Sequence, residues 1–136
     1  MTATHLADKS VLARLHHQPV HSRVGPMLVE GMIATCPIID LEVLYSARSA
    51  ADHTAILAER RAMPSFVIDE QVTDRAIEVQ GLLAETGMHR LPIPDLLIAA
   101  VAELNGLTVL HYDADFDRIA SVTGQVCQWV MPPGSI

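Results

Sequence analysis

The sequence predicts an α/β protein with a central parallel sheet of four to five strands, flanked by helices on both faces. Short apolar, β-branched segments alternate with longer stretches in which apolar residues recur at helical spacing. This alternation is typical of parallel sheets, because a helix has to carry the chain back between neighbouring strands. A length of 136 residues and a hydrophobic content of 50% indicate a single domain over residues 1–136.

Two strands and two helices are predicted in the first quarter of the chain. "ATHLAD" (residues 3–8) predicts a strand, and a helix begins near Ser10 with its apolar residues on one face. Residues 20–32 form a second apolar helical stretch, and we expect the "GP" pair in its middle to interrupt it. "MIAT" (residues 32–35) predicts a brief second strand.

The middle of the chain predicts three helices around a short strand. "PIIDLEVLYSARS" (37–49) is helical, with its proline tolerated in the first turn, and "DHTAILAERRAM" (52–63) follows it. "SFVI" (65–68) predicts the strand, and residues 69–87 predict a long helix that Gly87 ends. The apolar residues of this long helix have the spacing of a buried stripe: Val72, Ala76, Val79 and Leu83.

The last third predicts two helices and two strands. "IPDLLIAAVAELNG" (93–106) starts with a proline in its first turn and stops at Asn-Gly, as helices do. "LTVLHY" (107–112) is β-branched and apolar, so it predicts a strand, and "DFDRIA" (115–120) predicts a short helix. "QVCQWV" (125–130) predicts the final strand.

Composition excludes several classes of protein. No apolar run approaches the roughly 18 residues that a membrane span requires, and no secretion signal is visible. Cys36 and Cys127 lie far apart, so we expect free thiols in a reducing compartment and a cytoplasmic protein. The net charge of −7 argues against a broad basic surface for nucleic acid. It leaves open an enzyme that meets phosphates through metal ions held by its own carboxylates.

Four acidic residues occupy positions that favour a metal site. Asp8 and Asp113 directly follow two predicted strands, so their carboxylates reach the same edge of a parallel sheet. Asp95 and Glu42 lie within otherwise apolar helices, where a charge is costly without a partner such as a divalent cation. Ser10 adds a hydroxyl near Asp8, which we expect to orient its carboxylate or a bound water.

Each acid also has a purely structural interpretation. Asp95 could favour a helix N-terminus, Asp113 could be an N-cap, and Glu42 could face solvent. Other chemistries fit the sequence less well. A calcium loop starting at Asp113 would need glycine and glutamate where Arg118 and Gly124 stand. No phosphate-binding loop, paired zinc ligands or nucleophile elbow occurs either.

The segments "LADKSVLARL", "IDLEVLYSAR" and "IPDLLIAAVAELNGLTVLHYDADFDRIA", in this order, resemble PIN-domain ribonucleases, specifically the VapC-type toxins of bacterial toxin–antitoxin pairs. The resemblance covers essentially the whole chain, although "DKS" stands where the family often has "DTS". It implies a PIN-like fold and an acidic set that binds Mg²⁺ or Mn²⁺: Asp8, Glu42, Asp95 and Asp113, with Asp115 beside the metals. Asp117 matches a less decisive position and is expected on the helix surface, while Asp40 is expected to be solvated or to start its helix.

The resemblance also implies an activity and its partners. The expected reaction is endonucleolytic RNA cleavage, in which the cations polarise the phosphodiester and activate a water. The expected partners are a VapB-type antitoxin with a basic tail, a second copy of this chain in a homodimer, and DNA only through the antitoxin. The apolar segment "VGPMLVEGM" (24–32) is a candidate dimer surface, and Arg60, Arg61 or Arg75 could contact phosphates. A metal-dependent phosphatase and a non-catalytic α/β binding module remain as alternatives.

Overall fold

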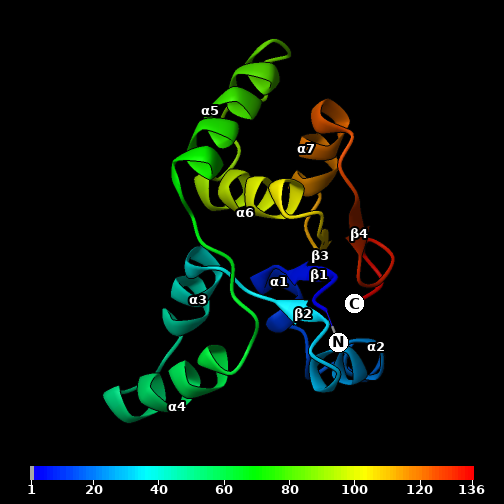
Figure 1. Cartoon of the computed structure of the whole chain (residues 1–136). Coiled ribbons are helices and arrows are strands. Elements are labelled where there is room, and N and C mark those ends of the chain that lie inside the picture. The colour runs from blue at the N-terminus through cyan, green and yellow to red at the C-terminus, as the bar shows by residue number, and fades with distance from the viewer. Residues whose placement is uncertain (1) are drawn as a thin grey trace.

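Four parallel strands form the central sheet in the computed structural model, which describes residues 2–136 (Figure 1). They are β1 (His5–Ala7), β2 (Ile33–Ala34), β3 (Thr108–His111) and β4 (Cys127–Trp129), in the spatial order β2-β1-β3-β4. Leu6 of β1 lies opposite Ala34 on one side and Val109 on the other. Because every pair is parallel, the carboxyl ends of all four strands meet at one edge, as predicted.

The fifth predicted strand, "SFVI", is reduced to a single bridge between Thr35 and Ser65. The Thr35 N–H donates to the Pro64 carbonyl at 2.8 Å, and the Phe66 N–H donates to the Thr35 carbonyl at 3.0 Å. The pairing cannot extend further, because the neighbouring chain turns into a helix at Pro37, whose nitrogen has no hydrogen to donate. The prediction of a full strand at residues 65–68 was therefore wrong.

Seven helices lie within residues 2–136: α1 (Lys9–Leu12), α2 (Gln18–Val29), α3 (Pro37–Leu44), α4 (Ala50–Arg61), α5 (Glu70–Ala84), α6 (Ile93–Leu104) and α7 (Asp115–Thr123). Ser49 caps α4 by accepting from the Asp52 N–H at 3.1 Å, and Asp69 caps α5 by accepting from the Val72 N–H at 3.0 Å. Helices α3 and α4 extend away from the sheet on the side opposite α7 (Figure 1). None of the helices has the length and apolar character that a bilayer crossing needs.

Helix α2 runs without a break through Gly25 and Pro26, which corrects the expected interruption. Two features permit this. Gly25 has no Cβ to clash with the proline ring, which is the usual obstacle to a helical residue before proline. Pro26 and Ser22, whose carbonyl would have accepted the missing hydrogen bond, both face solvent, so water can satisfy that carbonyl.

The sheet separates two hydrophobic cores, and the register explains how. Leu6 and Val109 are paired and face the core built with α5, α6 and α7. The next pair, Ala7 and Leu110, faces the core built with α1 and α2. Successive strand residues point to opposite faces, so one register serves both layers. Helices therefore cover both faces, as predicted.

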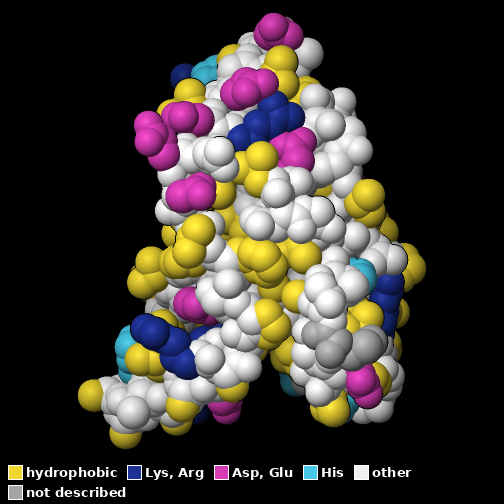
Figure 2. Space-filling view, viewed as in Figure 1, with side chains coloured by type: hydrophobic (Ala, Val, Ile, Leu, Met, Phe, Trp, Pro, Cys, Tyr) yellow, Lys and Arg dark blue, Asp and Glu magenta, His cyan; other side chains and the backbone are white. Residues whose placement is uncertain are grey.

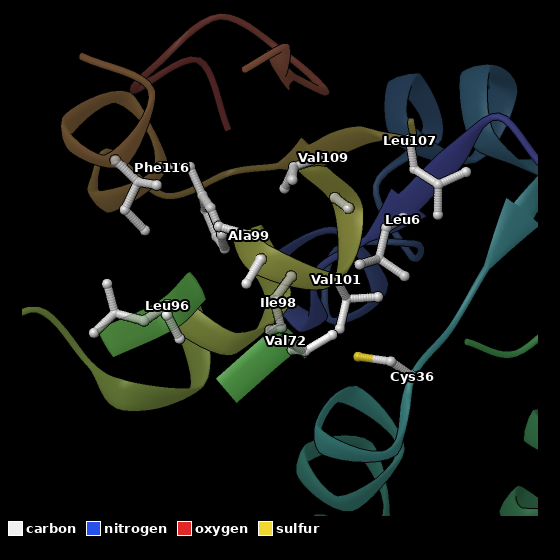
Figure 3. Close-up of a cluster of buried hydrophobic side chains, with 14 of the residues drawn as sticks. Leu6, Cys36, Val72, Leu96, Ile98, Ala99, Val101, Leu107, Val109 and Phe116 are labelled. Carbon is white, nitrogen blue, oxygen red and sulfur yellow. The ribbon is translucent and has the colours of Figure 1, made fainter. Parts of the chain in front are cut away.

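Helix α6 is the central element of the larger core. Ile98, Val101 and Ala102 are fully buried, and Figure 3 shows Ile98 and Val101 pointing toward Leu6 and Val72. Removing a buried isoleucine side chain typically costs about 2–5 kcal/mol, so this packing holds α6 firmly against the sheet. Asp95, in the first turn of α6, thereby lies close to Asp113, which follows β3.

Candidate metal centre at the carboxyl edge of the sheet

Asp8 lies directly after β1 and is almost fully buried, with 3% of the residue's surface exposed. Its backbone N–H donates to the Leu110 carbonyl of β3 at 2.9 Å. Its side chain caps α1 by accepting from the Ser10 N–H at 3.0 Å. The carboxylate is therefore fixed beside the end of β3, as the sheet topology predicts.

Asp113 lies two residues beyond β3 and is held at both ends. Its backbone N–H donates to Nδ1 of His111 at 3.1 Å. Its Oδ1 accepts from the Asp115 N–H at 2.9 Å. This second contact is an Asx-type turn that starts α7 and brings the Asp115 carboxylate next to Asp113.

Asp95 approaches these residues from the first turn of α6. One carboxylate oxygen each from Asp95, Asp113 and Asp115 lie within 4.8 Å of one another. Asp95 is 7% exposed, and its Oδ2 is buried with no hydrogen-bond partner among residues 2–136. Burial, followed by the negative charges of Asp8 and its acidic neighbours, raises the pKa of Asp95 to about 8.

Glu42 joins the group from α3. Its Oε1 is buried without a partner among residues 2–136, and its Oε2 lies 3.4 Å from Nζ of Lys9. Burial raises the pKa of Glu42, and the nearby Lys9 ammonium opposes that shift. Asp8 and Glu42 lie outside the tight trio but close enough for both to raise the pKa of Asp95.

This arrangement fits a hard divalent cation. Asp95 and Glu42 each have a buried carboxylate oxygen without a hydrogen-bond partner in the described part of the chain. Such oxygens are costly in a folded protein, and each of these carboxylates faces further negative charge. A cation held by Asp95, Asp113 and Asp115 would offset the repulsion among these carboxylates. The three grouped residues offer only carboxylate oxygens, the ligands that hard divalent cations take.

Ser10 contributes differently from the expectation. Its backbone N–H, and not its hydroxyl, donates to Asp8. Its Oγ accepts from the Tyr112 N–H at 2.9 Å and so ties the start of α1 to the end of β3. Ser10 thus fixes the two segments that carry Asp8 and Asp113.

His111 is a residue of the site that the sequence analysis did not single out. It is fully buried, and burial lowers the pKa of its imidazole. The neutral ring can accept the Asp113 N–H at Nδ1, and it packs between Phe116 and Trp129 with ring centroids 5.1 and 4.9 Å away. His111 is the last residue of β3 and lies two residues before Asp113. This position was the signal in the sequence that could have identified it.

Two expectations about charged residues need correction. Asp40 is neither solvated nor merely a helix-starting acid: its Oδ1 accepts from Nε of the buried Arg60 at 2.9 Å and from the Thr35 hydroxyl at 2.8 Å. Arg75 is likewise engaged, through Glu103 at 2.6 Å. Neither arginine is available for phosphate, whereas Arg61 is exposed.

The face shown in Figure 2 agrees with the composition. On the face in Figure 2, Lys and Arg side chains stand in small separate groups among acidic and apolar ones, so this face carries no broad basic surface. Asp117 is exposed as expected, and it accepts from Nε1 of Trp129 at 3.1 Å.

Comparison with known proteins places the chain in a family. The PIN-domain family model matches residues 6–122. Ribonuclease VapC21 of Mycobacterium tuberculosis is 45% identical over 99% of both chains. Ribonuclease VapC51 of the same species is 45% identical, over 100% of this chain and 99% of the other.

Solved structures share the fold at lower identity. VapBC2 from Rickettsia felis, bound to a promoter DNA fragment, matches with a TM-score of 0.75 at 15% identity, over 95% of this chain and 98% of that chain. VapBC-1 from nontypeable Haemophilus influenzae matches with a TM-score of 0.72 at 18% identity, over 96% and 98%. From the family model and the full-length similarity, the chain belongs to the PIN-domain family, within its VapC group.

Proposed function

We propose that this chain is a metal-dependent endoribonuclease, the toxin of a toxin–antitoxin pair. The observation that carries the proposal is the group of carboxylates at the strand ends, in which Asp95 and Glu42 have buried oxygens without a hydrogen-bond partner among the residues that the structure describes. Full-length similarity to two proteins named ribonucleases supports RNA as the substrate. The parallel sheet, covered by helices on both faces, provides a rigid support for such a site.

In this proposal the metal ligands are Asp8, Glu42, Asp95, Asp113 and Asp115, and the cation is Mg²⁺ or Mn²⁺. When bound, such a cation supplies Lewis acidity toward a phosphoryl oxygen and lowers the pKa of a water molecule. The protein's own residues hold the ligands in place. Ser10 fixes Asp8 through its N–H, and His111 fixes Asp113 through Nδ1. No side chain has to act as a covalent nucleophile.

The proposed partner is a VapB-type antitoxin. The chains similar in fold include VapBC complexes from several bacteria. A guanidinium or ammonium of a basic antitoxin tail would compete with the cation for the carboxylates, through charge-assisted hydrogen bonds. The net charge of −7 would favour rapid capture of such a tail. DNA binding would then belong to the antitoxin and not to this acidic chain.

Cleavage of end-labelled single-stranded RNA tests the proposal. Wild-type protein should cleave internally with Mg²⁺ or Mn²⁺, stop with EDTA, and recover when the metal is restored. Asp8→Asn, Glu42→Gln, Asp95→Asn and Asp113→Asn should each abolish cleavage while circular dichroism shows an intact fold. Asp74→Asn is the matched control, because Asp74 is exposed on α5 and outside the carboxylate group.

Three outcomes would contradict the proposal. Full RNA cleavage in excess EDTA would remove the metal from the mechanism. Metal-dependent hydrolysis of p-nitrophenyl phosphate without RNA cleavage would indicate a phosphatase. Inactivity toward both substrates, with all partners removed, would indicate a binding module.

A further inference from the structure

A groove between α1 and α3 leads directly to the carboxylates. It has a volume of about 520 Å³, and both helices contribute to its walls. Glu42 and Asp113 line it together with Lys9, Arg14, Tyr45 and Tyr112. A ligand that fills this groove therefore lies against the carboxylates that we propose as metal ligands.

The groove places positive charge beside the acidic centre. Arg14 is held in position by donating from Nη1 to the Ser10 carbonyl at 2.9 Å, and its guanidinium carbon lies 4.5 Å from the Tyr112 ring centroid. Among residues 2–136 no carboxylate forms an ion pair with Arg14, in contrast to Arg60, Arg75 and Arg118. A fixed guanidinium without a carboxylate partner is suited to bind a phosphate.

The groove also presents an aromatic ring to solvent. Tyr45 is 91% exposed, and no hydrogen bond to its hydroxyl occurs within residues 2–136. It follows Glu42 by three residues, at the C-terminal end of α3, so both side chains lie on the same side of the helix. An exposed ring beside a phosphate-binding guanidinium is the combination with which proteins hold single-stranded nucleic acid.

On the basis of the proposed function, we propose that this groove binds the nucleotide next to the scissile phosphate of a single-stranded RNA. Arg14 holds the flanking phosphate, and the Tyr45 ring stacks on the base. Base stacking requires an unpaired nucleotide, so a continuous duplex does not fit. Arg14, with which no carboxylate within residues 2–136 forms an ion pair, supplies the positive charge that a phosphate needs beside the acidic centre.

Steady-state cleavage of a single-stranded RNA tests the assignment. Arg14→Ala and Tyr45→Ala should each raise KM about tenfold while kcat stays near the wild-type value, because the contacts hold a flanking nucleotide. Tyr45→Phe should behave like wild type, since stacking needs the ring and not the hydroxyl. Arg90→Ala is the control, as Arg90 is an exposed arginine outside the groove and removes the same charge.

Binding of the same RNA with Ca²⁺ in place of Mg²⁺ gives a second readout that does not require cleavage. Arg14→Ala should flatten the slope of log affinity against log salt by about 0.7, the value for one phosphate contact with a single strand. Arg90→Ala should leave this slope unchanged.

Several results would overturn the assignment. The first is a wild-type KM together with wild-type RNA affinity in both alanine variants. The second is a fall in kcat at unchanged KM. The third is loss of antitoxin inhibition with unchanged RNA binding, which would assign the groove to the antitoxin. If wild-type protein binds RNA with this residue pattern but does not cleave it, the proposed function fails, and only the assignment of Arg14 and Tyr45 to RNA binding stands.

Discussion

Replacing Asp95 by Asn should stabilise the metal-free protein. The carboxylate of Asp95 is buried among like charges, and its Oδ2 has no hydrogen-bond partner among residues 2–136. The amide of asparagine has nearly the same shape but carries no charge, so the substitution relieves both burial of charge and repulsion. The wild-type carboxylate provides a metal ligand but lowers the stability of the metal-free fold, a compromise that is common at functional sites.

The pKa of Asp95 gives the magnitude and its pH dependence. The fold raises this pKa from 3.8 to about 8, a shift of roughly four units at about 1.4 kcal/mol each. Because the pKa in the fold is above the unfolded value, stability is fully present below the unfolded pKa and is lost as the pH rises through about 8. The upper limit for the metal-free chain is therefore on the order of 5 kcal/mol.

We expect Asp95→Asn to raise the free energy of unfolding of the metal-free protein by about 2–4 kcal/mol at pH values above about 8. This corresponds to a rise in Tm of roughly 10 °C for a domain of this size. Thermal unfolding of both proteins in EDTA, across a pH series, measures it. The difference should shrink as the pH falls from about 8 toward 3.8, below which Asp95 is protonated in both the folded and the unfolded chain. Saturating Mg²⁺ should reverse the order, because only the wild type keeps the ligand. Equal Tm values in EDTA at every pH would refute the reasoning.

Three further predictions follow from the same contacts. Mg²⁺ affinity measured by calorimetry should rise with pH up to about 8, because Asp95 must lose its proton to bind the metal; a flat profile would count against this ligand. Lys9→Gln should tighten Mg²⁺ binding about two- to fivefold, since the ammonium occupies Oε2 of Glu42, and unchanged affinity would show that this ion pair is irrelevant. Arg60→Ala should lower the free energy of unfolding by about 3 kcal/mol in urea titration by leaving Asp40 partly buried and unpaired, and a change below about 0.5 kcal/mol would contradict the role assigned to this pair.

The sheet and the positions of the main acids could be predicted because they depend on local patterns. Alternating strands and helices imply a parallel sheet, and in a parallel sheet Asp8 and Asp113 must reach the same edge. The apolar run around Asp95 likewise predicted a buried helix with a charge in its first turn. These inferences need only the residues within each element and a general rule of topology.

The contacts that the sequence did not predict depend either on how separate segments pack or on a turn whose geometry the sequence pattern does not specify. Arg60 and Asp40 are 20 residues apart, and their pairing depends on how α3 and α4 pack. The segment 65–68 has strand-like composition, but its neighbour turns into α3 before a ladder can form. The hydrogen bond from Asp113 to His111 depends on the turn that follows β3, which composition alone does not specify.

The central claim is that the carboxylates at the strand ends hold a divalent cation, and an anomalous difference map of crystals grown with Mn²⁺ tests it most directly. We predict a peak within about 2.5 Å of carboxylate oxygens of Asp95 and Asp113, with Lys9 displaced from Glu42. Crystals of Asp113→Asn under the same conditions should show a weakened peak or none. A map from fully Mn²⁺-saturated wild-type crystals with no peak at this site, or with Mn²⁺ bound only elsewhere, would contradict the claim.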